Sequence, residues 1–461
     1  MQSRQRFRRR SFASTLGVVL GVVAGFGAAM WSVAGAGPSS TEPQAVFDVT
    51  HLPPLLTAPD EPIDLAYDVH CAAAEDETAD AGCDARGTVF VRTTGSTAFS
   101  ALPLENRVES GVRQLTVVVP DRFRGTGGIE YYAELEAPTV GREVTLPAGG
   151  AAAPHFSRPL LDSVTVELGH HGFGSNRRDG ARVAFASWGD RAGEAGLEQG
   201  RNLGPIGASA FDVDTSGSVF LLDQVHRRVL RWDEGKLAAN VPVSVNGTLA
   251  DMSVANDGSM YVLETTAPPG RRPLVRRFDD GGRELEAFET AERASSQIRI
   301  ENGSPVVLSR PSHHWTPVLV DGVPAPPARQ LERGRPGRRF GGGLEVVATR
   351  DGNEIRVAAV SRRGVTRSWR VRSATPLAEV QLAEPWGPRF VLVARVYDHT
   401  TDEFVVLVLG SNGLVDRFSL DSADWAEASP LARFKLLGRS LYRLGSSPAG
   451  VFVDRYDLEV G

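Results

Sequence analysis

The chain contains 461 residues, of which 41% are hydrophobic and 23% are charged, and it has 49 glycines and 29 prolines. These proportions exclude a largely disordered chain, and the length predicts two or three domains. The many turn-forming residues favour short strands over long helices. The formal net charge of −6 argues against generic binding to nucleic acid.

The first 36 residues have the pattern of a signal peptide. Five arginines precede an apolar run at residues 16–29, and the small residues Ala34-Gly35-Ala36 then offer a cleavage site. The sequence Arg9-Arg10-Ser11-Phe12-Ala13 is similar to the core of a twin-arginine motif, and general secretion is the other export route. If residues 16–34 are not cleaved, they are just long enough to anchor the chain in a bilayer of about 30 Å.

Export determines the expected location and charge of the mature chain. Loss of residues 1–36 removes five arginines and no acidic residue, which takes the formal charge from −6 to −11. We therefore expect an extracellular or cell-envelope protein, attached to a membrane only if residues 16–34 remain as an anchor. Residues 37–45 are polar and contain Pro and Ser, which is typical of a linker.

Cysteine occurs only twice, as Cys71 and Cys83. An even pair in an exported chain predicts one structural disulfide, and neither a CxxC motif nor further ligands point to redox or metal chemistry. The bond would close a loop of about a dozen residues and contribute about 2 to 3 kcal/mol to stability.

Short runs of alternating apolar and polar residues follow the linker. This alternation predicts half-buried strands, and turn-forming residues separate the runs. We predict an Ig-like or fibronectin-like β-sandwich at residues 46–154, without the Cys-Trp-Cys pattern of true immunoglobulin domains. The predicted strands are residues 63–69, 88–92, 114–119, 129–135 and 143–146.

The rest of the chain, residues 160–461, is repetitive. Its clearest unit is FDVDTSGSVFLLD at residues 211–223 followed by RRVLRW at 227–232, and a second copy begins at residue 252. Gly217 and Gly258 occupy the same place in the two copies, 41 residues apart. With weaker copies, six units fit, and such a repeat predicts a six-bladed β-propeller. The weaker copies are residues 298–308, 345–360, 390–408 and 441–456.

A propeller must join its first and last blades. The segments 164–168 and 182–187 precede the first clear unit, and either could supply an outer strand to the last sheet. We therefore expect the ring to close by mixing strands from both ends, which removes two exposed sheet edges.

Residues 207–232 resemble an NHL-type repeat, on the pattern apolar-Asp-Val-Asp-x-x-Gly-Ser-Val-aromatic-Leu-Leu-Asp followed by Arg227-Arg228-Val229 and an aromatic residue. The second copy departs from this pattern at Ala255 and Glu264. The resemblance covers about two blades and implies an NHL-like propeller. That fold hosts binding modules, lyases and lactonases alike, so it implies no single activity.

One acidic cluster invites a metal interpretation. Asp212, Asp214, Ser216, Gly217 and Asp223 lie at positions 1, 3, 5, 6 and 12 of a twelve-residue window, as in an EF-hand calcium loop. However, residues 219–222 are predicted to form a strand, and the closing residue is Asp instead of Glu. A β-hairpin turn is therefore the expected structure, with calcium as the alternative.

The paired histidines His170-His171 and His313-His314 are the other metal candidates, as possible zinc ligands. Adjacent residues of a strand point to opposite faces, so each extended pair would offer at most one ligand. We expect these histidines to lie on the surface or in loops.

Arginines at positions 333, 335, 338 and 339 form a candidate basic patch. Arg333, Arg335, Arg338 and Arg339 could attract an anionic cell-wall polymer or phospholipid. Solvated loops are the expected alternative, because arginine replaces lysine throughout this chain.

The sequence contains no HExxH or GxSxG motif and no Gly-rich phosphate loop. We predict an exported binding or scaffold protein without a cofactor, whose partner is a protein, a glycan or a cell-envelope polymer. The alternative is a metal-dependent propeller hydrolase or lyase that uses calcium or zinc at the acidic residues and histidines named above.

Overall fold

The computed structural model describes most of the chain beyond the predicted export segment. The predicted export segment (residues 1–36) and linker (residues 37–45) lie outside the described residues. Ala45–Gly461 forms one compact unit. The described residues are 46–59, 61–72, 84–109, 112–199, 204–246, 249–265, 267–268, 271–309, 313–361, 364–422, 424–426 and 433–459.

Strands dominate the described ranges, which confirms the all-β class. Their one α-helix is α2 (Pro327–Glu332), accompanied by short 3-10 turns. None of the helices in these ranges is long and apolar enough to cross a membrane.

Two sheets, here called the N-terminal sheets, occupy the first part of the described chain. The core between them is formed by the inward-facing residues of β8 (Ile129–Ala137), such as Tyr131, together with Leu65 and Tyr67 of β3 (Asp64–Ala72). The second sheet continues past residue 154, because it includes β10 (His155–Pro159). The first sheet has the order β1 (Val46–His51), β3 (Asp64–Ala72), β7 (Val112–Val118), β6 (Glu105–Glu109). The second has the order β2 (Leu56–Thr57), β10 (His155–Pro159), β8 (Ile129–Ala137), β4 (Arg86–Thr93), β5 (Ser100–Pro103), with β9 (Arg142–Leu146) beside β8.

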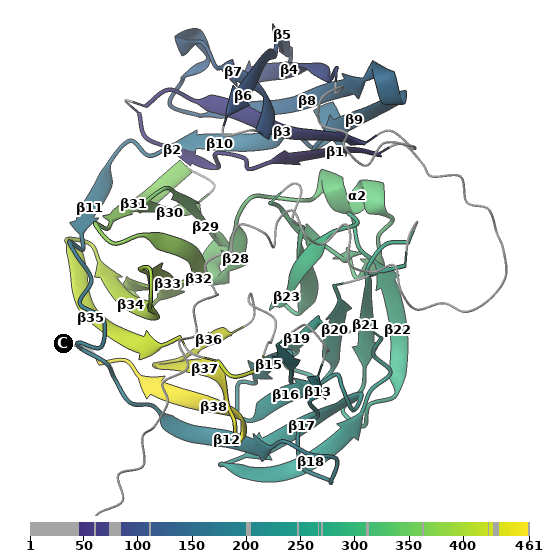
Figure 1. Ribbon diagram of the computed structural model, residues 1–461, viewed down its shortest axis with the longest axis vertical. Coiled ribbons are helices and arrows are strands. Elements are labelled where there is room, and N and C mark those ends of the chain that lie inside the picture. Colours follow the sequence, from purple (N-terminus) through teal and green to yellow (C-terminus); the bar gives the residue numbers. More distant parts are fainter. Residues whose placement is uncertain are drawn as a thin grey trace, which may run out of the picture. The chain divides into compact units, whose positions relative to one another are not determined.

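Six further sheets of the described chain form a ring and are called blades 1 to 6 (Figure 1). Blade 1 contains β15 (Ala210–Val213), β16 (Val219–Asp223), β17 (Arg228–Asp233) and β18 (Lys236–Pro242). Blade 2 contains β19 (Ala250–Val254), β20 (Met260–Glu264), β21 (Leu274–Phe278) and β22 (Glu284–Glu289). Blade 3 contains β23 (Ser295–Glu301), β24 (Ser304–Ser309) and β25 (Trp315–Pro317).

The second half of the ring has blades of four or five strands. Blade 4 has the order β11 (Ser163–Glu167), β31 (Gly364–Arg372), β30 (Glu354–Ser361), β29 (Leu344–Asp351), β28 (Arg338–Phe340). Blade 5 contains β32 (Leu377–Trp386), β33 (Arg389–Tyr397), β34 (Asp402–Gly410) and β35 (Gly413–Asp421). Blade 6 has the order β12 (Ala181–Ser187), β38 (Gly450–Asp457), β37 (Ser440–Ser447), β36 (Phe434–Leu437). Two short hairpins, β13 (Glu198–Gln199) with β14 (Pro205–Ile206) and β26 (Leu319–Val320) with β27 (Val323–Pro324), lie between blades.

The strands β15, β19, β23, β32 and β36 lie nearest the centre of the ring (Figure 1). Strands in the middle of a blade, such as β16 and β20, are buried along their whole length. Because neighbouring blades cover both faces of such a strand, it consists of nearly continuous apolar residues. This order of successive antiparallel sheets is that of a β-propeller.

The ring is closed by β12. This strand pairs antiparallel with β38, with Phe185 opposite Phe452 and Ser187 opposite Gly450. The expectation that residues 182–187 complete the last sheet is confirmed. The alternative, residues 164–168, is wrong, because β11 pairs parallel with β31 in blade 4. The chain leaves the N-terminal sheets next to blade 4, so its next strand joins that blade first.

The N-terminal sheets pack directly on blade 4. Leu55, Leu56 and Leu160 share a small apolar cluster with residues of β29 and β30, among them Val347 and Ala358. Ion pairs lie beside this cluster. We call the apolar cluster and these ion pairs together the junction. The Glu61 carboxylate pairs with the guanidinium groups of Arg356 and, at 2.9 Å, Arg370.

Candidate functional site

The inner strands carry buried charges, and Asp212 on β15 is the clearest of them. Its carboxylate pairs with Lys435 Nζ of β36 at 2.6 Å and accepts hydrogen bonds from Ser253 Oγ at 2.9 Å and Val254 N–H at 2.8 Å. Burial by itself would raise the pKa of Asp212, but Lys435 and the N–H of Val254 hold it below its usual value. Asp212 therefore joins blades 6, 1 and 2.

Asp251 on β19 makes the equivalent connection one blade further on. It accepts hydrogen bonds from Ile298 N–H and from the Arg299 guanidinium, both at 2.8 Å, in blade 3. Burial raises the pKa of Asp251 although both partners act in the opposite direction. The acidic residues of the inner strands are thus bonded across blade boundaries.

A second set of carboxylates lies where the second strand of a blade ends. Asp223 accepts hydrogen bonds from Gly196 N–H at 3.1 Å and Arg228 Nε–H at 2.9 Å, and it lies 2.8 Å from His226 Nδ1. Glu264, at the same position of blade 2, accepts from Asn246 N–H at 2.8 Å and Arg276 Nε–H at 2.9 Å. Each carboxylate fastens the third strand and the incoming chain to its blade.

The predicted calcium set does not form one site. Asp214 accepts hydrogen bonds from the N–H groups of Ser216 and Ser218, both at 2.9 Å, which is the turn expected at Gly217. Asp212 and Asp223 are bonded to other blade elements, as described above. Among the residues that the structure describes, no group of three or more His, Cys, Asp and Glu side chains is arranged to hold a metal ion.

The paired histidines lie in loops, one of the two expected positions, and one member of each pair is buried. His170 is exposed, whereas His171 is buried, with its Nε2 2.7 Å from Glu403 Oε2 and its Nδ1 3.0 Å from the Arg417 guanidinium. His314 is buried beside the N-terminal sheets, and His313 is half-buried. Each buried ring fills a position where a loop packs on another element, which a sequence pattern does not reveal.

The arginine cluster is not a continuous basic patch. Arg335 pairs with Glu301, Arg338 pairs with Glu384 at 2.7 Å, and the backbone N–H of Arg339 donates to Glu301 at 2.9 Å. The expectation of solvated loops is therefore wrong for Arg335 and Arg338, which connect blade 4 to blades 3 and 5. Arg333 lies at the end of α2, where it is exposed, as expected for a solvated loop.

Two tryptophans that the sequence analysis did not single out meet where the ring closes. Trp188 follows β12, and Trp425 lies in the connection from β35 to β36. Their ring centroids are 5.9 Å apart with an interplanar angle of 37°. Trp188 Nε1–H donates to the Ser447 carbonyl at 2.9 Å, which fixes its ring, and Trp425 is 37% exposed. The fold brings these two residues together, and their spacing in the sequence gives no sign of it.

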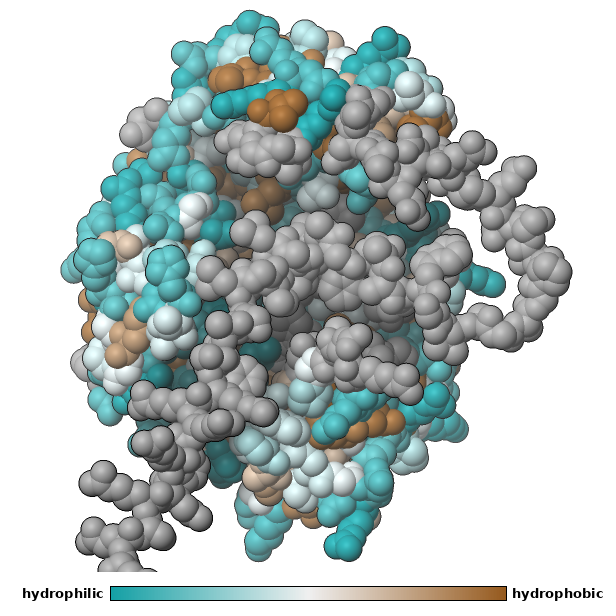
Figure 2. All heavy atoms as spheres, in the orientation of Figure 1, coloured by the Kyte–Doolittle hydropathy of each residue, from teal (hydrophilic) through white to brown (hydrophobic). Residues whose placement is uncertain are grey.

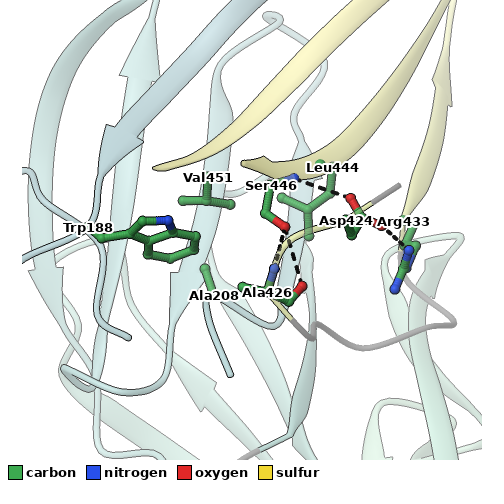
Figure 3. A pocket seen from close by; sticks show the side chains of 9 residues that line it. Trp188, Ala208, Asp424, Ala426, Arg433, Leu444, Ser446 and Val451 are labelled. Carbon is green, nitrogen blue, oxygen red and sulfur yellow. Dashed lines mark hydrogen bonds and ion pairs between the residues drawn. The ribbon is translucent and has the colours of Figure 1, made fainter. Parts of the chain in front are cut away.

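A small cavity lies next to Trp188 (Figure 3). Its volume of about 10 Å³ leaves room for at most one water molecule. Asp424 forms its polar wall, paired with Arg433 and accepting a hydrogen bond from Ser446 N–H at 3.2 Å. The other walls are Ala208, Ala426, Leu444, Gly445 and Val451. Residues from both ends of the ring thus line this cavity. We call the cavity and Trp425 together the closure site.

A wider, open hollow of about 610 Å³ lies on the N-terminal sheets, beside the β4–β5 turn. Its lining includes Phe123, Arg92 and Arg122. Arg92 is held by an ion pair with Glu130 at 2.5 Å and stacks on Phe99, 4.2 Å from the ring centroid. On the face of the molecule in Figure 2, hydrophilic residues cover most of the described surface, and hydrophobic residues form small separate groups.

Comparison with known proteins adds the following. No protein-family model matches the sequence, and no curated protein matches it. Among solved structures, virginiamycin B lyase from Staphylococcus aureus aligns with a TM-score of 0.31 and 10% identity, over 55% of this chain and 96% of that one. A protein of unknown function from Bacteroides caccae aligns with a TM-score of 0.33 and 13% identity, over 46% of this chain and 81% of that one. Likenesses at this level carry no argument about activity, and the propeller assignment rests on the order of the sheets.

Proposed function

We propose that the chain is an exported binding or scaffold protein that contacts a cell-envelope or extracellular partner through the closure site. The observation that carries this proposal is the contact of the half-buried, hydrogen-bonded Trp188 with the exposed Trp425, beside the half-buried Asp424–Arg433 ion pair. Aromatic side chains with a few oriented polar groups are the usual composition of binding surfaces.

The fate of the acidic residues supports a binding role over the alternative of a hydrolase or lyase. Asp212, Asp223 and Asp251 are each engaged in bonds between blade elements, and the candidate histidines belong to different loops. Among the residues that the structure describes, these side chains do not form one group, and the binding role is the one that we put forward.

Recovery of partners from a cell-envelope extract tests this proposal. We expect the purified protein to retain a protein, glycan or envelope polymer, and the Trp425→Ala variant to retain much less of it. Tyr397→Ala is the matched control, because Tyr397 is 44% exposed on blade 5 and is not part of the closure site. Recovery of no partner across a range of salt concentrations, or equal recovery by Trp425→Ala, would contradict the proposal.

We further propose that residues 1–36 direct export, that the blades are NHL-like repeats and that the N-terminal sheets are an Ig-like or fibronectin-like module. The patterns in the sequence described above support these assignments. Sequencing of the amino terminus of protein isolated from outside the cytoplasm tests the first: we expect it to begin at Gly37. An intact Met1 on membrane-bound protein would instead show that residues 16–34 are an anchor.

A further inference from the structure

Three histidine rings lie in contact where the N-terminal sheets meet the propeller. The ring centroid of His155 is 5.2 Å from that of His51 and 6.0 Å from that of His314. Tyr67 stacks on His51 at 4.2 Å, and Tyr131 lies edge-on to it at 5.7 Å. All three histidine side chains are buried, with at most 6% exposed. We call His51, His155 and His314 the histidine cluster.

The cluster is assembled from two parts of the fold. His51 ends β1 and His155 begins β10, so both belong to the N-terminal sheets. His314 immediately precedes β25 of blade 3. The His155–His314 contact therefore exists only while the N-terminal sheets are docked on the propeller.

The hydrogen bonds of His51 suit an uncharged ring. Its Nδ1 lies 2.7 Å from the Ala66 carbonyl and can only donate there. In the neutral ring Nε2 is then an acceptor, and the Tyr131 hydroxyl at 2.8 Å donates to it. Protonation of His51 would turn Nε2 into a donor and reverse this bond.

Burial makes a positive charge on His51 and His314 unfavourable. Burial lowers the pKa of both His51 and His314 to about 4, and the neighbouring His313 acts in the same direction. Acidic residues of the adjacent strands are bonded elsewhere: Asp68 of β3 to Gln114, and Glu130 of β8 to Arg92.

Other charged groups at this junction are Arg158 on β10, Arg335 next to β25, and Glu345 on β29. Glu345 interacts with both arginines, and its burial raises its pKa. Because its pKa is raised while it is buried, Glu345 takes up a proton in acid more readily in the docked state. Protonation of Glu345 therefore favours docking and opposes detachment. The two arginines stay positive at all relevant pH values and oppose any further positive charge.

We propose that the histidine cluster makes the docking of the N-terminal sheets acid-sensitive, so that protonation of the cluster releases them from the propeller while both parts stay folded. Burial disfavours a proton on His51 and His314 while the sheets are docked, and a ring that detachment exposes to water regains an ordinary affinity for protons. Docking is therefore fully stable above pH 6.5 and weakens as the pH falls from 6.5 toward 4. Each histidine weakens it by up to about tenfold per pH unit in this window.

Hydrogen exchange of the full chain between pH 7.5 and 5.0, corrected for the intrinsic exchange rate, tests the proposal. We expect protection of β10 and β25 to fall at least about tenfold, while that of β33 and β34 in blade 5 stays unchanged. The radius of gyration from X-ray scattering should increase over the same pH range.

Variants identify the groups responsible. The double variant His155→Gln and His314→Gln lacks two of the rings that can take up a proton. We expect its detachment to move to lower pH or to disappear. The control His399→Gln, at an exposed turn of blade 5, should behave as the wild type. If the double variant is already detached at pH 7.5, each single variant is measured in the same way. Unchanged protection of wild-type β10 and β25 at pH 5.0, or variants that remain docked at pH 7.5 but detach at the wild-type pH, would overturn the proposal.

Discussion

Buried carboxylates in this propeller are tolerated because each one is given specific partners. Asp212 remains ionised since Lys435 and backbone N–H groups replace the water that it loses. Asp251 has a guanidinium in place of the ammonium, yet burial prevails and its pKa rises. The two residues consequently respond to acid in opposite directions. The stabilisation from Asp212 is present above pH 3.8 and is lost as the pH falls through its lowered pKa. Asp251 has a raised pKa, so it binds a proton more readily in the folded protein, and a fall in pH favours the folded state at this position.

Replacement of Asp212 tests its role as a connection between blades. Asp212→Asn leaves the Lys435 ammonium without its carboxylate, and loss of one partner of a buried pair costs about 3 kcal/mol or more. We expect this loss in the free energy of unfolding by urea, monitored by tryptophan fluorescence. Asp214→Asn is the control, because it affects only a turn at the surface and should cost about 1 kcal/mol or less. Equal effects of the two substitutions would contradict the connecting role.

Removal of metal ions separates the proposed binding protein from the alternative enzyme. Because Asp212, Asp214 and Asp223 are satisfied by protein partners, we predict that EDTA leaves the melting temperature unchanged and that purified protein contains no stoichiometric calcium or zinc. A metal present at one equivalent, whose removal lowers the melting temperature, would contradict this prediction.

The roles of single residues were the least predictable from the sequence. The spacing of Asp212, Asp214 and Asp223 resembled a calcium loop, but strand β16 separates the last from the first two. His171 and His314 lie in loops, which was one of the expected positions, but the sequence did not predict that both are buried. Each of these outcomes depends on which distant element packs against the residue, and local spacing holds no information on that.

At the scale of elements, alternation and turn residues predicted much more. The repeat around Gly217 and Gly258 became the hairpins β15–β16 and β19–β20, because a tight turn between two strands needs the positive φ that both glycines adopt. Short strands such as β36, and the choice between β11 and β12 as the closing strand, could not be decided from the sequence. Pairing between strands far apart in the chain depends on the path of the chain in space.

One of the two cysteines of the predicted disulfide, Cys71, lies on β3. Cys71 is 3% exposed on this strand, while Cys83 lies outside the described residues, so their pairing stays a prediction. We expect the double substitution Cys71→Ser and Cys83→Ser to destabilise the N-terminal sheets by about 2 to 3 kcal/mol. Calorimetry should show little change in the propeller transition, because the main core of the N-terminal sheets is separate from it. Free thiols in the exported, non-reduced protein would refute the pairing.

At the scale of the whole described unit, two bodies with separate cores are joined by one small interface. The apolar cluster at Leu56 and Leu160 is limited in size, so the ion pairs of Glu61 with Arg356 and Arg370 contribute to docking. The sequence predicted both bodies, but it did not predict their contact, since Glu61 and Arg356 are almost 300 residues apart.

Glu61→Gln tests the strength of this interface. The substitution keeps the size of the side chain and removes its charge, and partly exposed ion pairs of this kind contribute about 1 kcal/mol. We expect hydrogen exchange of β2 and β10 to become about five times faster at pH 7.5, in line with that free energy. Glu105→Gln, at an exposed position of β6, should change nothing. Unaltered exchange in Glu61→Gln would show that the charge of Glu61 does not contribute to docking.

The central claim is that the propeller is a closed ring whose closure by β12 and β38 also builds the closure site. Calorimetry of a chain that lacks residues 446–461 tests it most directly, because the deletion removes β38 and leaves β12 without its partner. A closed ring predicts loss of the cooperative transition of the entire propeller. An open array of repeats loses stability one repeat at a time, so a truncated chain that retained most of its cooperative transition would contradict the account.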